Sequence, residues 1–293
     1  MGESRNTTRQ PRNCQDLIQQ GITPEGHYVV YSDDTTLGRA SIIYCFEDDG
    51  FIPLPRDTNK DVPRNCLDHQ QNGMTANGIM VIYPYADHPD TPALVLCDQE
   101  TEGGGWTVIQ HRYNGSENFY RPWVEYSEGF GNPANEHYLG NDLISALTAQ
   151  DVNELWVDLE DSDGVTAYAH YQAFHVELSS SYYRLSVFNY DGTASDALAY
   201  NTGQYFSTFD EDHDSSANDC ATNHESAWWY NACSYVDLNA PYADGSSYWN
   251  PFGYVKKSKM MIRPHCRVTA HNGVLHDIQD PAAHLQRSHL QGT

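Results

Sequence analysis

Basic residues are scarce in this chain, which has 16 lysines and arginines against 40 aspartates and glutamates, for a formal net charge of -24 over 293 residues. A surface of that sign repels phosphate backbones and anionic lipid headgroups. The sequence also lacks any apolar run of the roughly 18 residues that a membrane-spanning helix needs. These absences predict a protein with no nucleic-acid partner and no membrane insertion.

Common catalytic and zinc-binding motifs are also missing. None of the seven cysteines forms a C-x-x-C pair, which argues against zinc ribbons and thioredoxin-like redox sites. The sequence has no H-E-x-x-H, Walker or nucleophile-elbow motif, so we expect no enzyme. It has neither a Gly-X-Y run nor a sustained heptad, so this chain carries no collagen-like stalk or coiled coil.

A repeat is present instead. Shifting the sequence by 52 residues aligns RNCQDLIQQGITPEGHYVVY, residues 12–31, with RNCLDHQQNGMTANGIMVIY, residues 64–83. The cysteines follow the same shift, and pairing within each unit is the most economical arrangement. The predicted bridges are Cys14 with Cys45 and Cys66 with Cys97. We interpret residues 12–46 as a truncated duplicate that is followed by a linker rich in proline and aspartate.

Two N-x-S/T sequons begin at Asn6 and Asn114. Together with predicted disulfides, they are typical of a glycoprotein that folds in an oxidising compartment. The first residues lack the apolar run of a signal peptide. We therefore expect a secreted, extracellular protein whose signal peptide is not part of this sequence.

Hydrophobic periodicity predicts an antiparallel sheet with short helices. Apolar and polar residues alternate in 153–161, 166–178 and 182–192, as half-buried strands do, whereas 122–131 and 137–150 have helical patterns. In the second helix Leu143, Ile144 and Leu147 share one face, and Asn141 or Asp142 is a plausible N-cap. Asn114-Gly115, which follows a β-rich run, predicts a hairpin turn.

The stretch DEDHDSSANDC, residues 210–220, places Asp210, Asp212 and Asp214 at alternate positions. Crowded carboxylates favour Ca²⁺ over softer metals, but a solvated acidic turn explains the same pattern. An EF-hand is excluded, because Ser215 and Ala221 stand where that motif needs glycine and glutamate. A bridge from Cys220 to Cys233 would close a small ring at the end of the loop, and would contribute about 3 kcal/mol in the chain-entropy model.

At this point several segments, in register, resemble a fibrinogen-related domain: CDQETEGGGWTVIQHRYNGSENFYRPWVEYSEGFGN, YLGND, DEDHDSSANDCA, AWWYNAC, DLN and MMIRP. The resemblance covers about residues 64–264. It implies an α+β fibrinogen-like domain with a disulfide-closed N-terminal hairpin subdomain, a central antiparallel sheet with short helices, and a loop-rich calcium-binding subdomain. Residues 1–63 would be an N-terminal extension that holds the duplicate unit, and residues 265–293 a flexible tail.

The resemblance also implies a calcium site. Its register places side-chain ligands at Asp212 and Asp214 and backbone carbonyl ligands at Ser216 and Asn218, and water would fill the remaining positions. Asp210 becomes a neighbour of the site rather than a ligand. The expected cofactor is therefore Ca²⁺.

Lectin-like members of the family, such as ficolins and tachylectins, bind acetyl groups of N-acetylated sugars beside the calcium. The peptide bond before the second cysteine is cis in those members, which here means Ala232–Cys233. The walls of that pocket correspond to His224, Cys233, Ser234, Tyr242, Ala243 and Tyr254. Ser234 stands where histidine is common and His224 where tyrosine is usual, and one rim is shorter. In the alternative interpretation, Tyr242 and Tyr254 simply pack the core of the loops.

The expected function is a calcium-dependent recognition lectin for acetylated glycans, in innate immune pattern recognition. The alternative is a protein-interaction, extracellular-matrix or receptor-ligand module of the fibrinogen-like type. Cys266 is the seventh, unpaired cysteine, which suggests a homo-oligomer through an interchain bridge. A free thiol, or a partner cysteine outside this sequence, explains it equally. We expect Trp228, Trp229 and Tyr230 to fill the core rather than to bind sugar.

Overall fold

The computed structural model describes residues 62–85, 88, 91–242 and 245–265, and the backbone of three strands between residues 26 and 53. Several predicted features lie outside these residues, namely Asn6, Ala243, Cys266 and the partner cysteine of Cys45. Among the helices of the described residues, none is long and apolar enough to cross a membrane.

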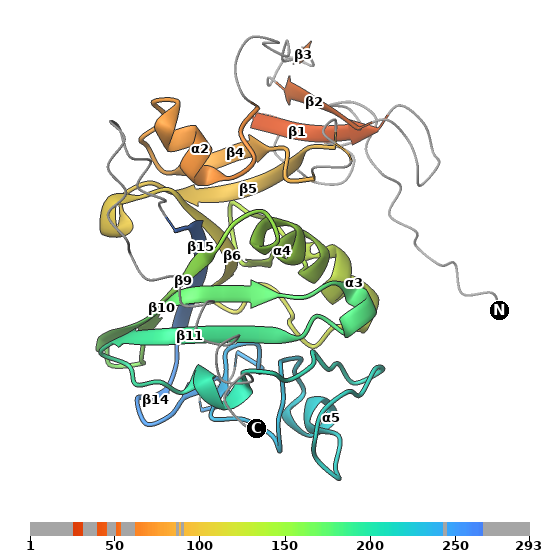
Figure 1. The fold of residues 1–293 in the computed structure, drawn as a ribbon, viewed down its shortest axis with the longest axis vertical. Helices are drawn as coiled ribbons and strands as arrows, with labels where there is room; N and C mark the ends of the chain where they lie inside the picture. The colour runs from red at the N-terminus through yellow and green to blue at the C-terminus, as the bar shows by residue number, and fades with distance from the viewer. Residues whose placement is uncertain are drawn as a thin grey trace, which may run out of the picture.

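A nine-stranded antiparallel sheet forms the centre of the molecule (Figure 1), with the order β11-β10-β9-β15-β6-β5-β4 and with β7 and β8 attached beside β6. Its strands are β4 (Gly78–Ile82), β5 (Ala93–Asp98), β6 (Trp106–Arg112), β7 (Phe130–Gly131), β8 (His137–Tyr138), β9 (Asn153–Glu160), β10 (Thr166–Val176), β11 (Leu185–Gly192) and β15 (Lys257–Pro264). The strands predicted from period-two alternation correspond to β9, β10 and β11. β15, the last strand of the described residues, lies between β6 and β9 and so completes the middle of the sheet.

Short helices flank the sheet, as predicted. They are α2 (Cys66–Gln71), α3 (Trp123–Glu128), α4 (Asn141–Thr148) and α5 (Cys220–His224), with 3-10 turns η1 (Thr101–Gly103), η2 (Ser179–Ser181) and η3 (Leu198–Asn201). In α4, Leu143, Ile144 and Leu147 are buried, as their shared face predicts. The N-cap prediction was wrong, because Gly140 occupies that position and Asn141 begins the helix.

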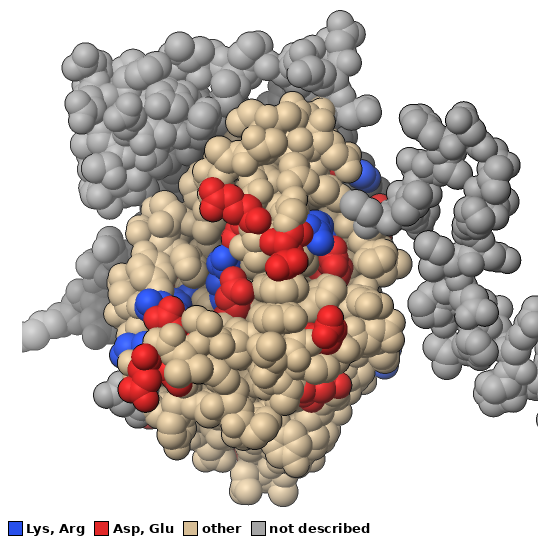
Figure 2. Space-filling model, turned by 90° about the vertical axis from the view of Figure 1, so that its left-hand side faces the viewer, with Lys and Arg blue, Asp and Glu red and all other residues tan. Residues whose placement is uncertain are grey.

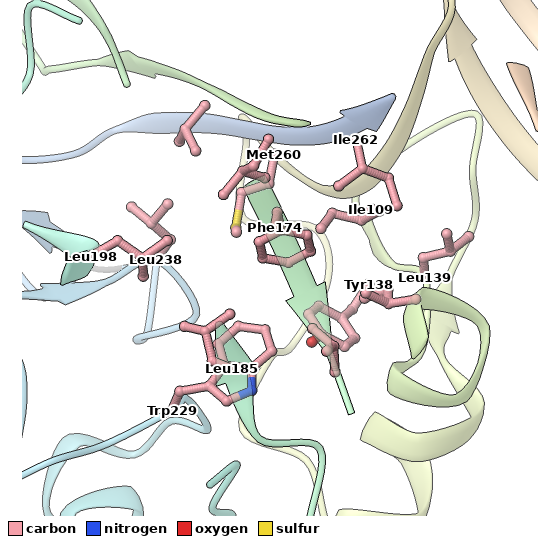
Figure 3. Close-up of a cluster of buried hydrophobic side chains, with 14 of the residues drawn as sticks. Ile109, Tyr138, Leu139, Phe174, Leu185, Leu198, Trp229, Leu238, Met260 and Ile262 are labelled. Carbon is pink, nitrogen blue, oxygen red and sulfur yellow. The ribbon is translucent and has the colours of Figure 1, made fainter. Parts of the chain in front are cut away.

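The main core fills the space between the sheet, the helices and the loops that follow η3 (Figure 3). Phe174 and Leu185 come from strands, and Trp229 reaches them from the loop-rich end, where its indole N–H donates to the carbonyl of Tyr183 at 2.7 Å. Trp228 and Tyr230 are fully buried beside Trp229, which confirms the prediction that these aromatics fill the core. Burial of large rings anchors the loop-rich end to the sheet.

The duplicated unit repeats the strand register of the main domain. β1 (Gly26–Tyr31) pairs with β2 (Ala40–Cys45) so that Gly26 faces Cys45, and β4 pairs with β5 so that Gly78 faces Cys97. β3 (Phe51–Pro53) adds a third strand beside β2. The shift of 52 residues seen in the sequence is therefore preserved in the backbone pairing of the two hairpins.

The loop after β6 is not the predicted hairpin turn. The next strand to pair with β6 is β8, more than twenty residues later, and the buried Glu136 just before β8 holds the loop. Its Oε1 accepts the backbone N–H groups of Tyr113, Asn114 and Gly115 at 2.7 to 2.8 Å, and its Oε2 accepts that of Glu117 at 2.9 Å. A carboxylate distant in sequence holds the loop, and a local contact, in which the Asn114 side chain accepts the Ser116 N–H at 2.9 Å, adds to it.

The surface is sparsely basic, in agreement with the composition. On the face shown in Figure 2, basic side chains are few and lie close to acidic ones. The ion pairs of the described residues include Lys259 Nζ with Asp98 at 2.7 Å and with Asp158 at 3.1 Å. Acidic charge thus neutralises much of the limited basic charge within the chain itself.

Candidate functional site

The acidic loop brings three carboxylates together. One ligand oxygen each from Asp212, Asp214 and Asp219 lies within 4.8 Å of the others. Asp212 is exposed, and the other two are partly buried. The sequence placed Asp212 and Asp214 in the calcium site, but it did not assign Asp219. The sequence did hold a signal for Asp219. The pattern Asp-x-x-Thr over residues 219–222 is typical of a helix start at which the aspartate side chain caps the backbone.

Backbone amides fix the loop around these carboxylates. Asp214 accepts the N–H of Ser216 at 2.7 Å and that of Cys220 at 2.9 Å, through different oxygens. Asp212 accepts the N–H of Asp214 at 3.1 Å, and Asp219 caps α5 by accepting from the Thr222 N–H at 2.8 Å. The loop is therefore shaped by the same side chains that form the acidic cluster.

The cluster suits a hard divalent cation. Burial and the nearby negative charge of Asp212 raise the pKa of Asp214 above its ordinary value, against the opposing effect of the amide hydrogen bonds from Cys220 and Ser216. Like charges at this spacing repel, and a cation between them removes that repulsion. Oxygen-only donors favour Ca²⁺ or Mg²⁺ over softer metals. Among the described residues, no backbone amide outside the helices and strands donates to the carbonyl of Ser216 or Asn218.

Asp210 lies apart from the three-carboxylate cluster. Its Oδ1 accepts the Trp123 N–H at the start of α3 at 2.9 Å and the Thr208 hydroxyl at 2.7 Å. A tight turn, in which Thr208 and Glu211 exchange backbone hydrogen bonds, holds it in place. Asp210 thus anchors the acidic loop to α3 and is a neighbour of the cluster.

The disulfide Cys220–Cys233 closes the far end of the loop, as the sequence predicted, with its Cα atoms 5.5 Å apart. Cys66–Cys97 closes the N-terminal hairpin, with its Cα atoms 5.4 Å apart. The predicted cis bond at Ala232–Cys233 is not found, because the cis bond of the described residues is Asn250–Pro251. The Asn231 N–H donates to the Cys233 carbonyl at 2.8 Å across a tight trans turn, and a trans bond avoids the roughly 3 kcal/mol of a cis bond without proline.

A cavity of about 580 Å³ lies at the other end of α5. Its lining comes from α5, β13 (Tyr248–Trp249), β14 (Gly253–Tyr254) and the loop before β13, and comprises Asn223, His224, Gly245, Ser246, Tyr248, Asn250, Gly253 and Tyr254. His224 and Tyr254 were predicted from the sequence. Asn223 and Tyr248 were not predicted to line it. Tyr248 alternates with the buried Trp249, but a two-residue strand is too short to show this period in the sequence.

Three other predicted wall residues, Cys233, Ser234 and Tyr242, do not line this cavity, and Ala243 lies outside the described residues. The Ser234 hydroxyl accepts from the Asn201 side chain at 2.8 Å and from the Val236 N–H at 3.0 Å, so it joins loops internally. The Tyr242 ring carries Lys256 Nζ 4.5 Å from its centroid and Arg112 Cζ at 5.7 Å. Cation–π contacts hold Tyr242 away from the cavity. Cys233 also lies outside the lining, since it is committed to the disulfide.

A buried carboxylate supports the inner wall. Asp237, in β12 (Val236–Asp237), accepts hydrogen bonds from the Ser226 hydroxyl at 2.8 Å and from the Tyr230 hydroxyl at 2.5 Å. Burial raises its pKa, against the effect of these hydrogen bonds. The Tyr230 ring stacks beside His224 with centroids 5.8 Å apart. The position of His224 is therefore supported by a fully buried hydrogen-bonded group.

Helix α5 connects the two features. Asp219 caps its first turn, whereas Asn223 and His224 in its last turn line the cavity. Five helical residues rise only about 7 Å, so the acidic cluster and the cavity are close neighbours on one rigid element.

Comparison with known proteins agrees with this architecture. Residues 62–265 match the family model "Fibrinogen beta and gamma chains, C-terminal globular domain". Mouse fibrinogen C domain-containing protein 1 is 45% identical over 215 residues, which cover 68% of this chain and 46% of that protein. The chain thus spans about half the length of the curated relatives of that name.

Solved structures give the same result. The fibrinogen-like globe domain of human ANGPTL6 is 36% identical, with a TM-score of 0.67, and the match covers 72% of this chain and all of that one. Lamprey fibrin D-dimer, complexed with the peptide ligand Gly-His-Arg-Pro-amide, is 31% identical with a TM-score of 0.65, over 76% of this chain and 81% of that one. The sheet order, the two disulfides and these matches together show that the chain belongs to the family of fibrinogen C-terminal globular domains.

Proposed function

We propose that this protein is a calcium-dependent extracellular lectin that binds acetylated glycans in the cavity beside the acidic loop. Fibrinogen-like domains are in general not enzymes, so recognition is the class of function to consider. The observation that carries the proposal is α5, which joins a three-carboxylate cluster at one end to an aromatic cavity at the other. Calcium would be held by Asp212 and Asp214 with backbone carbonyls.

The cavity has the chemistry of a sugar site. Tyr248 and Tyr254 offer ring faces against which a methyl group or a sugar ring can be buried without stranding polar atoms. Asn223, Ser246 and Asn250 offer hydrogen-bonding groups along the same wall. One such open site would bind weakly, so several copies in an oligomer would supply useful avidity. We propose further that the protein forms a homo-oligomer through a Cys266 bridge and recognises acetylated glycans on foreign surfaces in innate immunity.

Calorimetry tests this proposal. N-acetylglucosamine titrated into calcium-loaded protein should release heat, whereas glucosamine, or either sugar after a chelator, should not. Tyr254→Ala should weaken the binding, because Tyr254 is 65% exposed and lines the cavity. The matched control is Tyr235→Ala, which removes a ring that is 54% exposed outside the lining. Equal heats for both sugars, or equal effects of both variants, would contradict an acetyl-specific site.

A protein-interaction module is the second candidate function. The fibrin D-dimer structure holds a peptide ligand, so a protein of the same fold is a peptide binder. Ser234, which stands where histidine is common in the lectin-like members, and the shorter rim of the pocket favour this candidate. Competition for a bound protein partner tests this candidate. The partner should stay bound in saturating N-acetylglucosamine, and an excess of the peptide through which it binds should displace it.

A further inference from the structure

Exposed aromatic rings gather beside α3, away from the cavity. We define the aromatic patch as Tyr120, Trp123, Tyr182, Tyr205, Phe209 and His213. Tyr182 is 46% exposed, Tyr205 is 40% and Phe209 is 38%. Large aromatic side chains rarely stay this exposed in a group unless they contact a partner.

The rings form two groups of contacts, a pair and a set of four. Tyr120 packs on Phe209 with centroids 4.8 Å apart, and His213 stacks on Tyr182 at 4.0 Å. His213 also meets the Trp123 ring edge-on at 5.2 Å, and Tyr182 meets Tyr205 at 5.7 Å. The two groups meet through the backbone, because Asp210, next to Phe209, accepts the Trp123 N–H at 2.9 Å.

The backbone holds these rings in fixed positions. Phe209 sits in the tight turn between Thr208 and Glu211. Tyr182 and Tyr183 both have φ near +51°, a conformation rarely adopted outside glycine. Tyr183 is buried, and its hydroxyl donates to Asp142 at 2.7 Å, whereas Tyr182 points outward. Rings that are already ordered lose little conformational entropy when a partner binds.

The surroundings of the patch are acidic. Asp210, Glu211 and Asp212 are exposed beside Phe209. Between residues 113 and 255 the only lysine or arginine residues are Arg121 and Arg184. Arg121 is paired with Glu117 and Glu125, and Arg184 with Glu177, so both basic charges are compensated within the chain. Neither arginine is therefore an unpaired partner for the patch, and a cationic partner would complement the carboxylates of Asp210 and Glu211.

We propose that the aromatic patch is a docking surface for an arginine-rich segment of a partner protein. Guanidinium groups stack on aromatic faces, and they also donate to carboxylates such as those of Asp210 and Glu211. Arginine fits both features at once, whereas lysine fits chiefly the charge. This surface is independent of the glycan site, because none of its rings lines the cavity.

Fluorescence polarisation on the full chain in saturating calcium tests this proposal. The probes are labelled decapeptides of alternating arginine and glycine, lysine and glycine, or glutamate and glycine. The arginine peptide should bind at least about threefold more tightly than the lysine peptide, and the glutamate peptide should not bind. Phe209→Ala should weaken arginine-peptide binding about 2- to 5-fold, and the double change with Tyr205→Ala about tenfold.

Matched controls separate this surface from general attraction to a chain of net charge -24. Phe188→Ala removes an aromatic ring that is 55% exposed on β11, and Asp163→Asn removes an exposed acid outside the patch. Neither should change binding. Glu211→Gln, at a side chain 54% exposed, should weaken it without affecting folding. Equal losses for Phe209→Ala and Phe188→Ala, or equal affinity for the arginine and lysine peptides, would overturn the proposal.

Discussion

Replacing Glu136 by glutamine should destabilise the domain substantially. The residue is 1% exposed, and its carboxylate accepts four backbone N–H groups from residues 113–117. Glutamine keeps one acceptor oxygen, but it places an NH₂ group against the Glu117 N–H and removes the negative charge. Hydrogen bonds to a charged group contribute about 1.5 to 3 kcal/mol each, and glutamine loses chiefly the one from the Glu117 N–H, because its remaining oxygen can still accept the other three. We expect a net loss of about 2 to 3 kcal/mol in the free energy of unfolding.

Urea denaturation of both proteins across a pH series measures this loss. Burial opposes ionisation, yet the four amides outweigh it and hold the pKa of Glu136 below its ordinary value of 4.5. A depressed pKa in the folded state stabilises the fold above pH 4.5, and this contribution disappears as pH falls through the folded pKa. The difference in the free energy of unfolding between wild type and Glu136→Gln should therefore be largest at neutral pH and should decrease in strong acid.

The control variant is Glu128→Gln, which removes an exposed carboxylate at the end of α3. It should change the free energy of unfolding by less than about 0.5 kcal/mol. If Glu136→Gln behaves like this control, or if its effect does not depend on pH, the reasoning about the loop anchor is refuted.

Three other predictions follow from single features. Asn114 is exposed, so protein from a secreting eukaryotic cell should lose mass on enzymatic deglycosylation, and Asn114→Gln should abolish that loss; an unchanged wild-type mass would contradict it. Replacing Cys220 and Cys233 together by serine should cost about 3 kcal/mol and weaken calcium binding; an unaltered urea midpoint would count against that. Despite burial, the Lys259 ammonium keeps the pKa of Asp98 low, so Lys259→Met should raise it in an NMR titration; no change would refute the pairing.

The sheet could be predicted from the sequence because its strands are buried on one face over several residues. In β9, Leu155, Val157 and Leu159 are buried, while Trp156 and Asp158 between them are partly exposed. The disulfide Cys66–Cys97 could be predicted because the same cysteine spacing occurs twice in the sequence. Both signals are local in sequence, so neither needs knowledge of tertiary contacts.

Features that depend on distant contacts could not be predicted. The helix expected over 137–150 begins only at Asn141, because His137 pairs with β6 instead. The turn at Asn114 is decided by Glu136. Tyr242 was assigned to the cavity by resemblance, but Arg112 and Lys256 hold its ring elsewhere. In each case a partner more than ten residues away determines the outcome.

Titration of calcium into chelator-stripped protein, followed by calorimetry, tests the central claim most directly. We predict one site per chain in the wild type, a large loss of affinity in Asp212→Asn and Asp214→Asn, and wild-type affinity in the control Asp163→Asn. An absence of binding heat in the wild type, or equal affinities in all four proteins, would contradict a calcium ion at the acidic loop.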